Sequence, residues 1–97
     1  MRDVVIVDSV RTGLTKAFRG SFNLTRSDDM LAHCIDSLLD RNPNLSPEEV
    51  EDVVVGAATH AGEQDGNLAR LAVVLSKLPI TVAGVSINRF CSSGLQA

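Results

Sequence analysis

The sequence lacks the features that most directly assign a function to a chain. Its 97 residues carry a net charge of −3, which argues against a nucleic acid or an anionic membrane surface as partner. No apolar run approaches the length of a membrane span, and the short run after Asp3 is too brief for a secretory signal. Dinucleotide-binding, P-loop, serine-hydrolase and zinc-binding motifs are absent, and there is no internal repeat.

Cysteine and aromatic residues are also scarce. Tryptophan and tyrosine are absent, and the two cysteines, Cys34 and Cys91, lack the spacing of a metal site. Isolated thiols are typical of a reducing compartment, so we expect free thiols, no bound metal and a cytoplasmic location. A chain of this length, 44% of it hydrophobic, can bury a single thin core.

Apolar periodicity divides the chain into alternating strands and helices. Short β-branched runs predict buried strands, and apolar residues at helical spacing predict amphipathic helices. The expected strands cover residues 4–7, 53–55 and 82–87, and the expected helices cover 28–41, 67–78 and the stretch from Cys91 onward. The order β-α-β-α-β-α is typical of an α/β fold with a mostly parallel sheet and right-handed crossovers.

The expected helices carry recognisable start and stop signals. Ser27 is the expected N-cap of the first helix, and Ser46 opens a capping box that predicts one short helical turn. Pro79 is expected to end the second helix. In the first helix Cys34 lies beside the apolar stripe, which predicts a packing role. We expect His33 at the surface, because no metal-ligand partner lies at helical spacing.

Two polar loops admit more than one interpretation. Residues 13–27 carry Lys16, Arg19 and Arg26, and a solvated loop is favoured over a cationic loop near an anionic substrate or a subunit contact. His60 lies in the loop after the second expected strand, where open α/β sheets bind ligands. A surface histidine is nevertheless the favoured interpretation, because no partner residue is visible.

The strongest chemical signal is Cys91, which follows the third expected strand at the start of a helix. The first turn of a helix has unpaired N–H groups and the positive end of the helix dipole, which favour a thiolate. The small residues 92–94 let a substrate come close. The pattern indicates that Cys91 attacks an acyl carbonyl. The alternative role of any single cysteine is that of a small buried apolar residue in the core.

Three segments of the sequence resemble the thiolase family. Residues 88–97, Asn-Arg-Phe-Cys-Ser-Ser-Gly-Leu-Gln-Ala, look like the segment that bears the thiolase nucleophile, and the Asn-Arg pair resembles 3-ketoacyl-CoA thiolases (acetyl-CoA acyltransferases). Residues 5–12 resemble the family's start, and residues 67–70 resemble the opening of its second helix. The resemblance covers the whole chain in order. Gly13 departs from it, since many thiolases have a stiffer proline there.

The resemblance implies an acyltransferase in which Cys91 is the catalytic residue. Cys91 would take the acyl group of a 3-ketoacyl-CoA as its Cα–Cβ bond is cleaved, and would pass that group to coenzyme A. The reverse reaction is a Claisen condensation. Coenzyme A is then a co-substrate, no tightly bound cofactor is expected, and fatty acid β-oxidation is the implied process. Thiolases use two histidines and a second cysteine from their later part, and His33, His60 and Cys34 do not match these residues.

The resemblance also implies an assembly. Known thiolases are dimers or tetramers whose third strand pairs with its two-fold mate. We therefore expect a homo-oligomer with residues 82–87 near the interface, with a β-oxidation partner subunit as a further candidate. Gly84 and Ser86 are small enough for another backbone to come close to this strand.

The end of the sequence bears on its completeness. Ala97 lies about two turns into the helix that begins at Cys91, and so short a helix is unstable when isolated. We expect residues 1–97 to be part of a longer thiolase and inactive alone. The alternatives are a ketoacyl-synthase-type condensing enzyme, a non-catalytic dimerisation or regulatory module, and a redox-sensing thiol. Arg11-Thr12 and the Asn-Arg pair before Cys91 argue against the ketoacyl synthase type.

Overall fold

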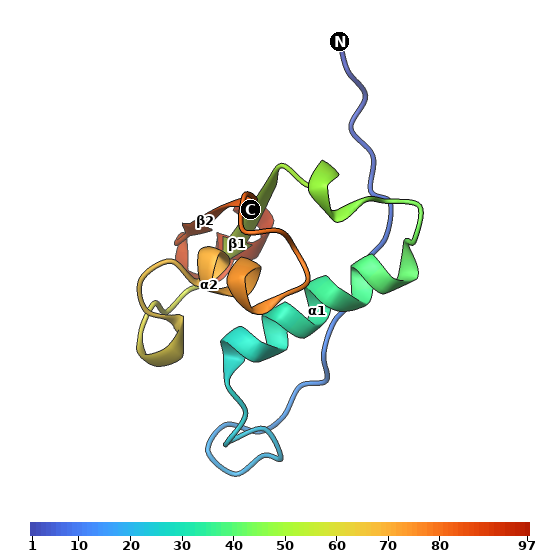
Figure 1. Ribbon diagram of the computed structural model, residues 1–97. Helices are drawn as coiled ribbons and strands as arrows, with labels where there is room; N and C mark the ends of the chain where they lie inside the picture. Colours follow the sequence, from blue (N-terminus) through green and yellow to red (C-terminus); the bar gives the residue numbers. More distant parts are fainter.

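The computed structural model describes residues 1–97 as an α/β arrangement built on a small parallel sheet (Figure 1). Strands β1 (Asp52–Gly56) and β2 (Ala83–Ile87) pair in parallel, from Asp52 opposite Ala83 to Gly56 opposite Ile87. Its helices are α1 (Ser27–Arg41), α2 (Leu68–Leu75) and α3 (Ser93–Gln96), with 3-10 turns η1 (Pro47–Glu49), η2 (Gly62–Gln64) and η3 (Phe90–Ser92). The predicted α/β class is confirmed.

The core lies between the sheet and the two longer helices. Val73 of α2 is completely buried and packs with Leu78 and Val82, and partly buried residues of α1 and β1 close around them. Apolar residues at helical spacing in α2 and β-branched residues in β1 meet here, because each element must cover its apolar side. This core fixes α2 on one face of the sheet.

Small residues on β2 allow α2 to approach closely. A Cβ atom added at Gly84 would lie 2.8 Å from the backbone N of Arg70. The Ser86 hydroxyl accepts a hydrogen bond from the Ala69 N–H (3.1 Å) and donates one to Asn67 Oδ1 (3.0 Å). Contacts with α2 therefore give a reason within the chain for both small residues, and a subunit contact along this strand stays a prediction.

The first expected strand is absent from the structure, so that prediction was wrong. Residues 4–7 are extended but unpaired, and their side chains are 74–96% exposed. A β-branched run becomes a strand only beside a free strand edge with which it can form hydrogen bonds. Here the segment is held instead at Asp8, which contacts Arg41 (2.8 Å) and Asn42 (3.0 Å) at the end of α1. Figure 1 shows the N-terminus extending away from the body.

The start of α1 also differs from the prediction. The N-cap is Arg26 rather than Ser27, and the Ser27 hydroxyl is buried without a partner. Arg26 instead contacts the buried carboxylate of Asp28 through two hydrogen bonds of 3.0 and 2.8 Å. The hydrogen bonds from Arg26 hold the pKa of Asp28 below its ordinary value, despite the burial of this carboxyl. The expected serine cap is therefore absent, and no side-chain hydrogen bond from the N-cap residue replaces it.

The other boundaries follow the prediction with shorter ends. The capping box at Ser46 is confirmed, since its N–H donates to Glu49 Oε2 (3.1 Å) at the start of η1. Helix α2 ends at Leu75 rather than at residue 78. Ser76 stops it, because its hydroxyl donates to the Val73 carbonyl (2.9 Å) and accepts from the Leu78 N–H (3.2 Å). None of the helices is long and apolar enough to cross a membrane.

Candidate active site

Cys91 lies in η3, in the connection between β2 and α3. Its side chain is exposed and its thiol is free. The predicted order of strand, tight turn and helix is present, with a 3-10 turn inserted before the α-helix. Because β1 and β2 are parallel, this connection leaves the sheet at the edge where both strands end. Open α/β sheets place their ligands at this edge.

The residue before Cys91 has an unusual backbone conformation. Phe90 has a φ angle of +48°, in the left-handed region, which costs a non-glycine residue about 1–2 kcal/mol. Its side chain is 76% exposed, so burial of the ring does not offset that cost. Strained backbone of this kind persists only where surrounding contacts hold it, and it is concentrated at functional sites.

Two side chains hold this turn by hydrogen bonds. Asn88 Oδ1 accepts from the Phe90 N–H (2.8 Å). The Ser93 hydroxyl accepts from the Arg89 N–H (2.8 Å) and donates to the Phe90 carbonyl (2.7 Å). Ser93 is only 3% exposed. The backbone on both sides of Phe90 is therefore fixed by side chains that flank Cys91 in sequence.

A glycine at the end of β1 seats the turn on the sheet. A Cβ atom added at Gly56 would lie 2.2 Å from the Ser93 carbonyl oxygen and 2.6 Å from the Gly94 N. Since side chains alternate along a strand, Gly56 faces the side opposite to Val55 and to α2. The backbone of α3 thus packs directly on the second face of the sheet, with Cys91 one turn earlier.

The other predicted candidates lie on elements other than the Cys91 turn, and none of them forms a hydrogen bond with Cys91. His60 is half-buried just beyond β1, and its Nε2 lies 2.8 Å from the Ala57 carbonyl oxygen. His33 is exposed on α1, and Cys34 is partly buried on the same helix, where the sequence predicted packing. No group of three or more histidine, cysteine or carboxylate side chains is placed to hold a metal ion. A ligand role for His60 stays a prediction.

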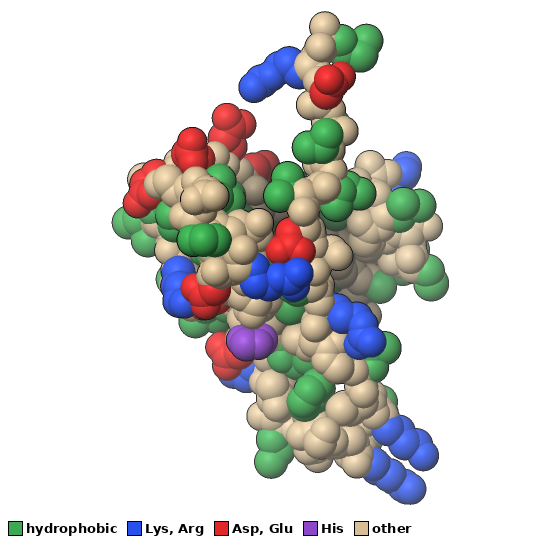
Figure 2. Space-filling model, turned by 90° about the vertical axis from the view of Figure 1, so that its right-hand side faces the viewer, with side chains coloured by type: hydrophobic (Ala, Val, Ile, Leu, Met, Phe, Trp, Pro, Cys, Tyr) green, Lys and Arg blue, Asp and Glu red, His purple; other side chains and the backbone are tan.

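The cationic loop is at one end of the molecule. Lys16 and Arg19 are exposed, whereas Arg26 is engaged with Asp28. Figure 2 shows basic side chains at the lower end, which this loop forms. The favoured prediction of a solvated loop agrees with this exposure, and a substrate or subunit contact is untested.

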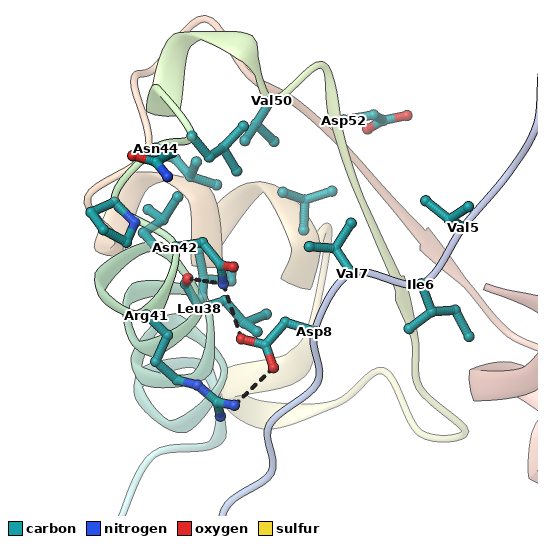
Figure 3. A pocket seen from close by; sticks show the side chains of 16 residues that line it. Val5, Ile6, Val7, Asp8, Leu38, Arg41, Asn42, Asn44, Val50 and Asp52 are labelled. Atoms are coloured by element: carbon teal, nitrogen blue, oxygen red, sulfur yellow. Dashed lines mark hydrogen bonds and ion pairs between the residues drawn. The ribbon is translucent and has the colours of Figure 1, made fainter.

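The largest groove is separate from Cys91. It measures about 850 Å³ and lies between the N-terminal segment, α1 and β1. Figure 3 shows Asp8 at its border, with Arg41 and Asn42 pointing toward it. A second groove of about 600 Å³ is lined by the loop and α1. Cys91 lines neither groove, so the thiol lies on an open surface of this chain.

Sequence reasoning missed three residues that shape the Cys91 turn. The sequence alone marks Ser93 only as a small residue and Asn88 only as part of a motif, and it assigns no role to Gly56. An asparagine two residues before a strained position is a recognisable signal, because its side chain can accept from that backbone N–H. The contact between Gly56 and Ser93 joins residues far apart in sequence and has no local signal.

Comparison with known proteins identifies the class to which this fold and turn belong. The family model described as thiolase, N-terminal domain, matches residues 4–97. The chain therefore belongs to the thiolase family, and the resemblance inferred from the sequence is confirmed. The match includes the Cys91 turn as well as both strands.

Individual relatives agree with this assignment. The chain is 44% identical over 97 residues to a protein named 3-ketoacyl-CoA thiolase from Aeromonas salmonicida (strain A449). It is also 44% identical to one of the same name from Aeromonas hydrophila subsp. hydrophila and 41% identical to one from Pseudoalteromonas atlantica. Each alignment covers 100% of this chain and 25% of the relative. The chain thus spans about a quarter of the length of the curated relatives it matches.

Proposed function

We propose that this chain carries the nucleophile of a 3-ketoacyl-CoA thiolase and that Cys91 is the nucleophile. The observation that carries the proposal is an exposed thiol directly after a strained, hydrogen-bonded turn, inside the region matched by the thiolase model. The names of the relatives at 41–44% identity supply the substrate class.

The proposed reaction is a thiolysis in two steps. The Cys91 thiolate adds to the 3-keto carbonyl carbon, an S–C bond forms, and the Cα–Cβ bond breaks. The electron pair of the broken bond moves to the Cα carbon of the departing acetyl-CoA, which takes up a proton. The thiol of coenzyme A then attacks the acyl-enzyme thioester, which releases the shortened acyl-CoA and frees Cys91. The reverse sequence is a Claisen condensation.

The roles of coenzyme A and of other subunits belong to the same proposal. Coenzyme A acts as co-substrate, and the reaction needs no tightly bound cofactor. A general base and an oxyanion-binding group must complete the site, because a thiolate attack on a ketone develops negative charge on oxygen. A homodimer or homotetramer with residues 82–87 near the interface, a role in β-oxidation and a cytoplasmic location are further parts of the proposal. The single-edged pairing of β2 is compatible with such an interface.

The first test replaces Cys91 in the natural protein that contains this chain. In Cys91→Ser we expect a loss of thiolysis of about a thousandfold or more, because a serine hydroxyl is far less nucleophilic near neutral pH. Intact-mass spectrometry after a brief incubation with 3-ketoacyl-CoA should show one added acyl group in the wild type and none in the variant.

The matched control is the other cysteine of the chain. Cys34→Ser should leave turnover within about twofold and should retain the acyl adduct, because Cys34 lies on α1 outside the Cys91 turn. An acyl group on Cys34, or full activity in Cys91→Ser, would contradict the proposal.

A further inference from the structure

Ser93 is one of two polar residues that are nearly completely buried in the chain, the other being Asp28. Asp28 has a charged partner that accounts for its burial. Ser93 lies in the first turn of α3, and its hydroxyl group forms both of its hydrogen bonds with the backbone of the turn that precedes Cys91. Its position therefore relates to the thiol more directly than to the core around Val73.

The two hydrogen bonds of Ser93 lie on opposite sides of the strained residue. The hydroxyl oxygen is 2.8 Å from the Arg89 N and 2.7 Å from the Phe90 carbonyl oxygen. Together with the Asn88 bond to the Phe90 N–H, these two bonds hold the backbone around a residue whose positive φ is unfavourable for a non-glycine residue. A change of φ and ψ at Phe90 would redirect the next residue, which is Cys91.

Ser93 is also anchored to the sheet by its own backbone. Its carbonyl group occupies the space where a side chain at Gly56 would lie. The backbone of Ser93 therefore packs against β1, while its hydroxyl group holds the turn before Cys91. This arrangement transmits the position of the rigid sheet to the exposed thiol.

We propose that Ser93 is a positioning residue for Cys91, whose buried hydroxyl holds the Phe90 turn so that the thiol is presented to the acyl carbonyl. The inference deepens the proposed thiolase function and rests on it for the identity of the reaction. Misplacement of a reacting group by about 1 Å is enough to reduce a rate by up to about a hundredfold.

The test compares two serines with matched hydrogen bonding in the natural protein that contains this chain. Ser86, on β2, also donates one hydrogen bond and accepts one, but its partners are on α2. Ser93→Ala should lower kcat about tenfold or more while KM stays within about threefold, since the change affects presentation of the thiol rather than binding. Ser86→Ala should leave kcat within about twofold, even with an equal loss of thermal stability.

A second measurement does not depend on the proposed reaction. Iodoacetamide alkylates a thiolate with loss of iodide, and peptide mass spectrometry reports Cys91 and Cys34 in the same sample. In Ser93→Ala the Cys91-to-Cys34 ratio of alkylation rates should fall about threefold or more, because the turn no longer holds the thiol outward. Ser86→Ala should leave the ratio unchanged.

The outcomes separate the two proposals. An unchanged kcat and alkylation ratio in folded Ser93→Ala would overturn the positioning role. If Ser93→Ala does not fold, Asn88→Ala replaces it: the exposed Asn88 holds the same turn, so a several-fold fall in both readouts is expected and no change refutes the role. If wild type forms no acyl-enzyme, the thiolase reaction is refuted, and the alkylation ratio alone decides whether Ser93 positions Cys91.

Discussion

Two runs of β-branched residues in this chain have different structures. Residues 53–55 form the centre of β1, paired in register with residues 84–86 of β2. Residues 4–7 are equally β-branched, yet they remain extended, unpaired and at least 74% exposed. Residues 53–55 have a parallel partner strand, to which α2 connects them, and α2 also covers one face of the pair. Intrinsic β preference is therefore not sufficient here, and a partner edge decides which run becomes a strand.

The end of β1 offers the most severe way to disrupt the paired region. Gly56→Ala should lower the free energy of unfolding by about 3 kcal/mol, since the added Cβ would lie 2.2 Å from a backbone oxygen. The clash is with the backbone of Ser93, so no side-chain rotation relieves it. Thermal or denaturant unfolding measures the loss, and the variant should also slow alkylation of Cys91.

Gly94 provides the matched control for Gly56. It is in α3, and a Cβ atom there would meet nothing within 4 Å. Gly94→Ala should leave the free energy of unfolding unchanged or raise it by about 0.5 kcal/mol, because alanine is the better helix former. Equal losses in the two variants would mean that the close contact at Gly56 is not what fixes α3 to the sheet.

A valine pair tests the packed region against the N-terminal segment directly. Val73→Ala should lower the free energy of unfolding by about 2 kcal/mol, because Val73 is fully buried and its loss leaves a cavity. Val5→Ala removes the same atoms from a side chain that is 74% exposed, and should cost less than about 0.5 kcal/mol. A large loss in Val5→Ala would show that residues 4–7 are packed in solution, as the sequence predicted.

The contrast also marks what the sequence could predict of the fold. Periodicity placed α1, β1, α2 and β2 in order, and their parallel pairing followed from the strand–helix–strand pattern. The errors at the helix ends arose from side-chain hydrogen bonds, which hydrophobic periodicity does not reveal. Ser76 ended α2 early through its hydroxyl, and α1 begins after Arg26 without the expected serine cap. The strand at 4–7 failed because pairing depends on a distant edge.

The candidate site was predictable to a similar extent. Cys91 and its place between a strand and a helix were evident from residues 82–97, because all of that signal is local. The left-handed Phe90 and the burial of Ser93 were not evident, since small residues are compatible with many turns. The family match adds membership of the thiolase family, which the sequence had suggested only by resemblance.

The N-terminal segment is held mainly at Asp8, which gives the smallest predicted effect. The Asn42 hydrogen bond, then the Ser9 N–H and finally the Arg41 charge hold the pKa of Asp8 below its ordinary value of 3.8. A lowered folded-state pKa stabilises this contact above the unfolded value, and the contribution is lost as the pH falls through the folded value. Residues 4–8 should therefore become more mobile as the pH falls below the ordinary Asp value and through the lowered pKa of Asp8.

An NMR titration of the Asp8 carboxyl carbon checks both the pH range and the cause. Asn42→Ala should raise the pKa of Asp8 toward 3.8 by more than Arg41→Gln does, because the hydrogen bond outweighs the charge of Arg41, whose side chain is exposed and screened by solvent. A larger rise in Arg41→Gln would reverse that order and make the segment's attachment salt-sensitive. Asp8→Asn should abolish the pH dependence of the segment, which would identify a single side chain as the link between residues 4–7 and the folded body.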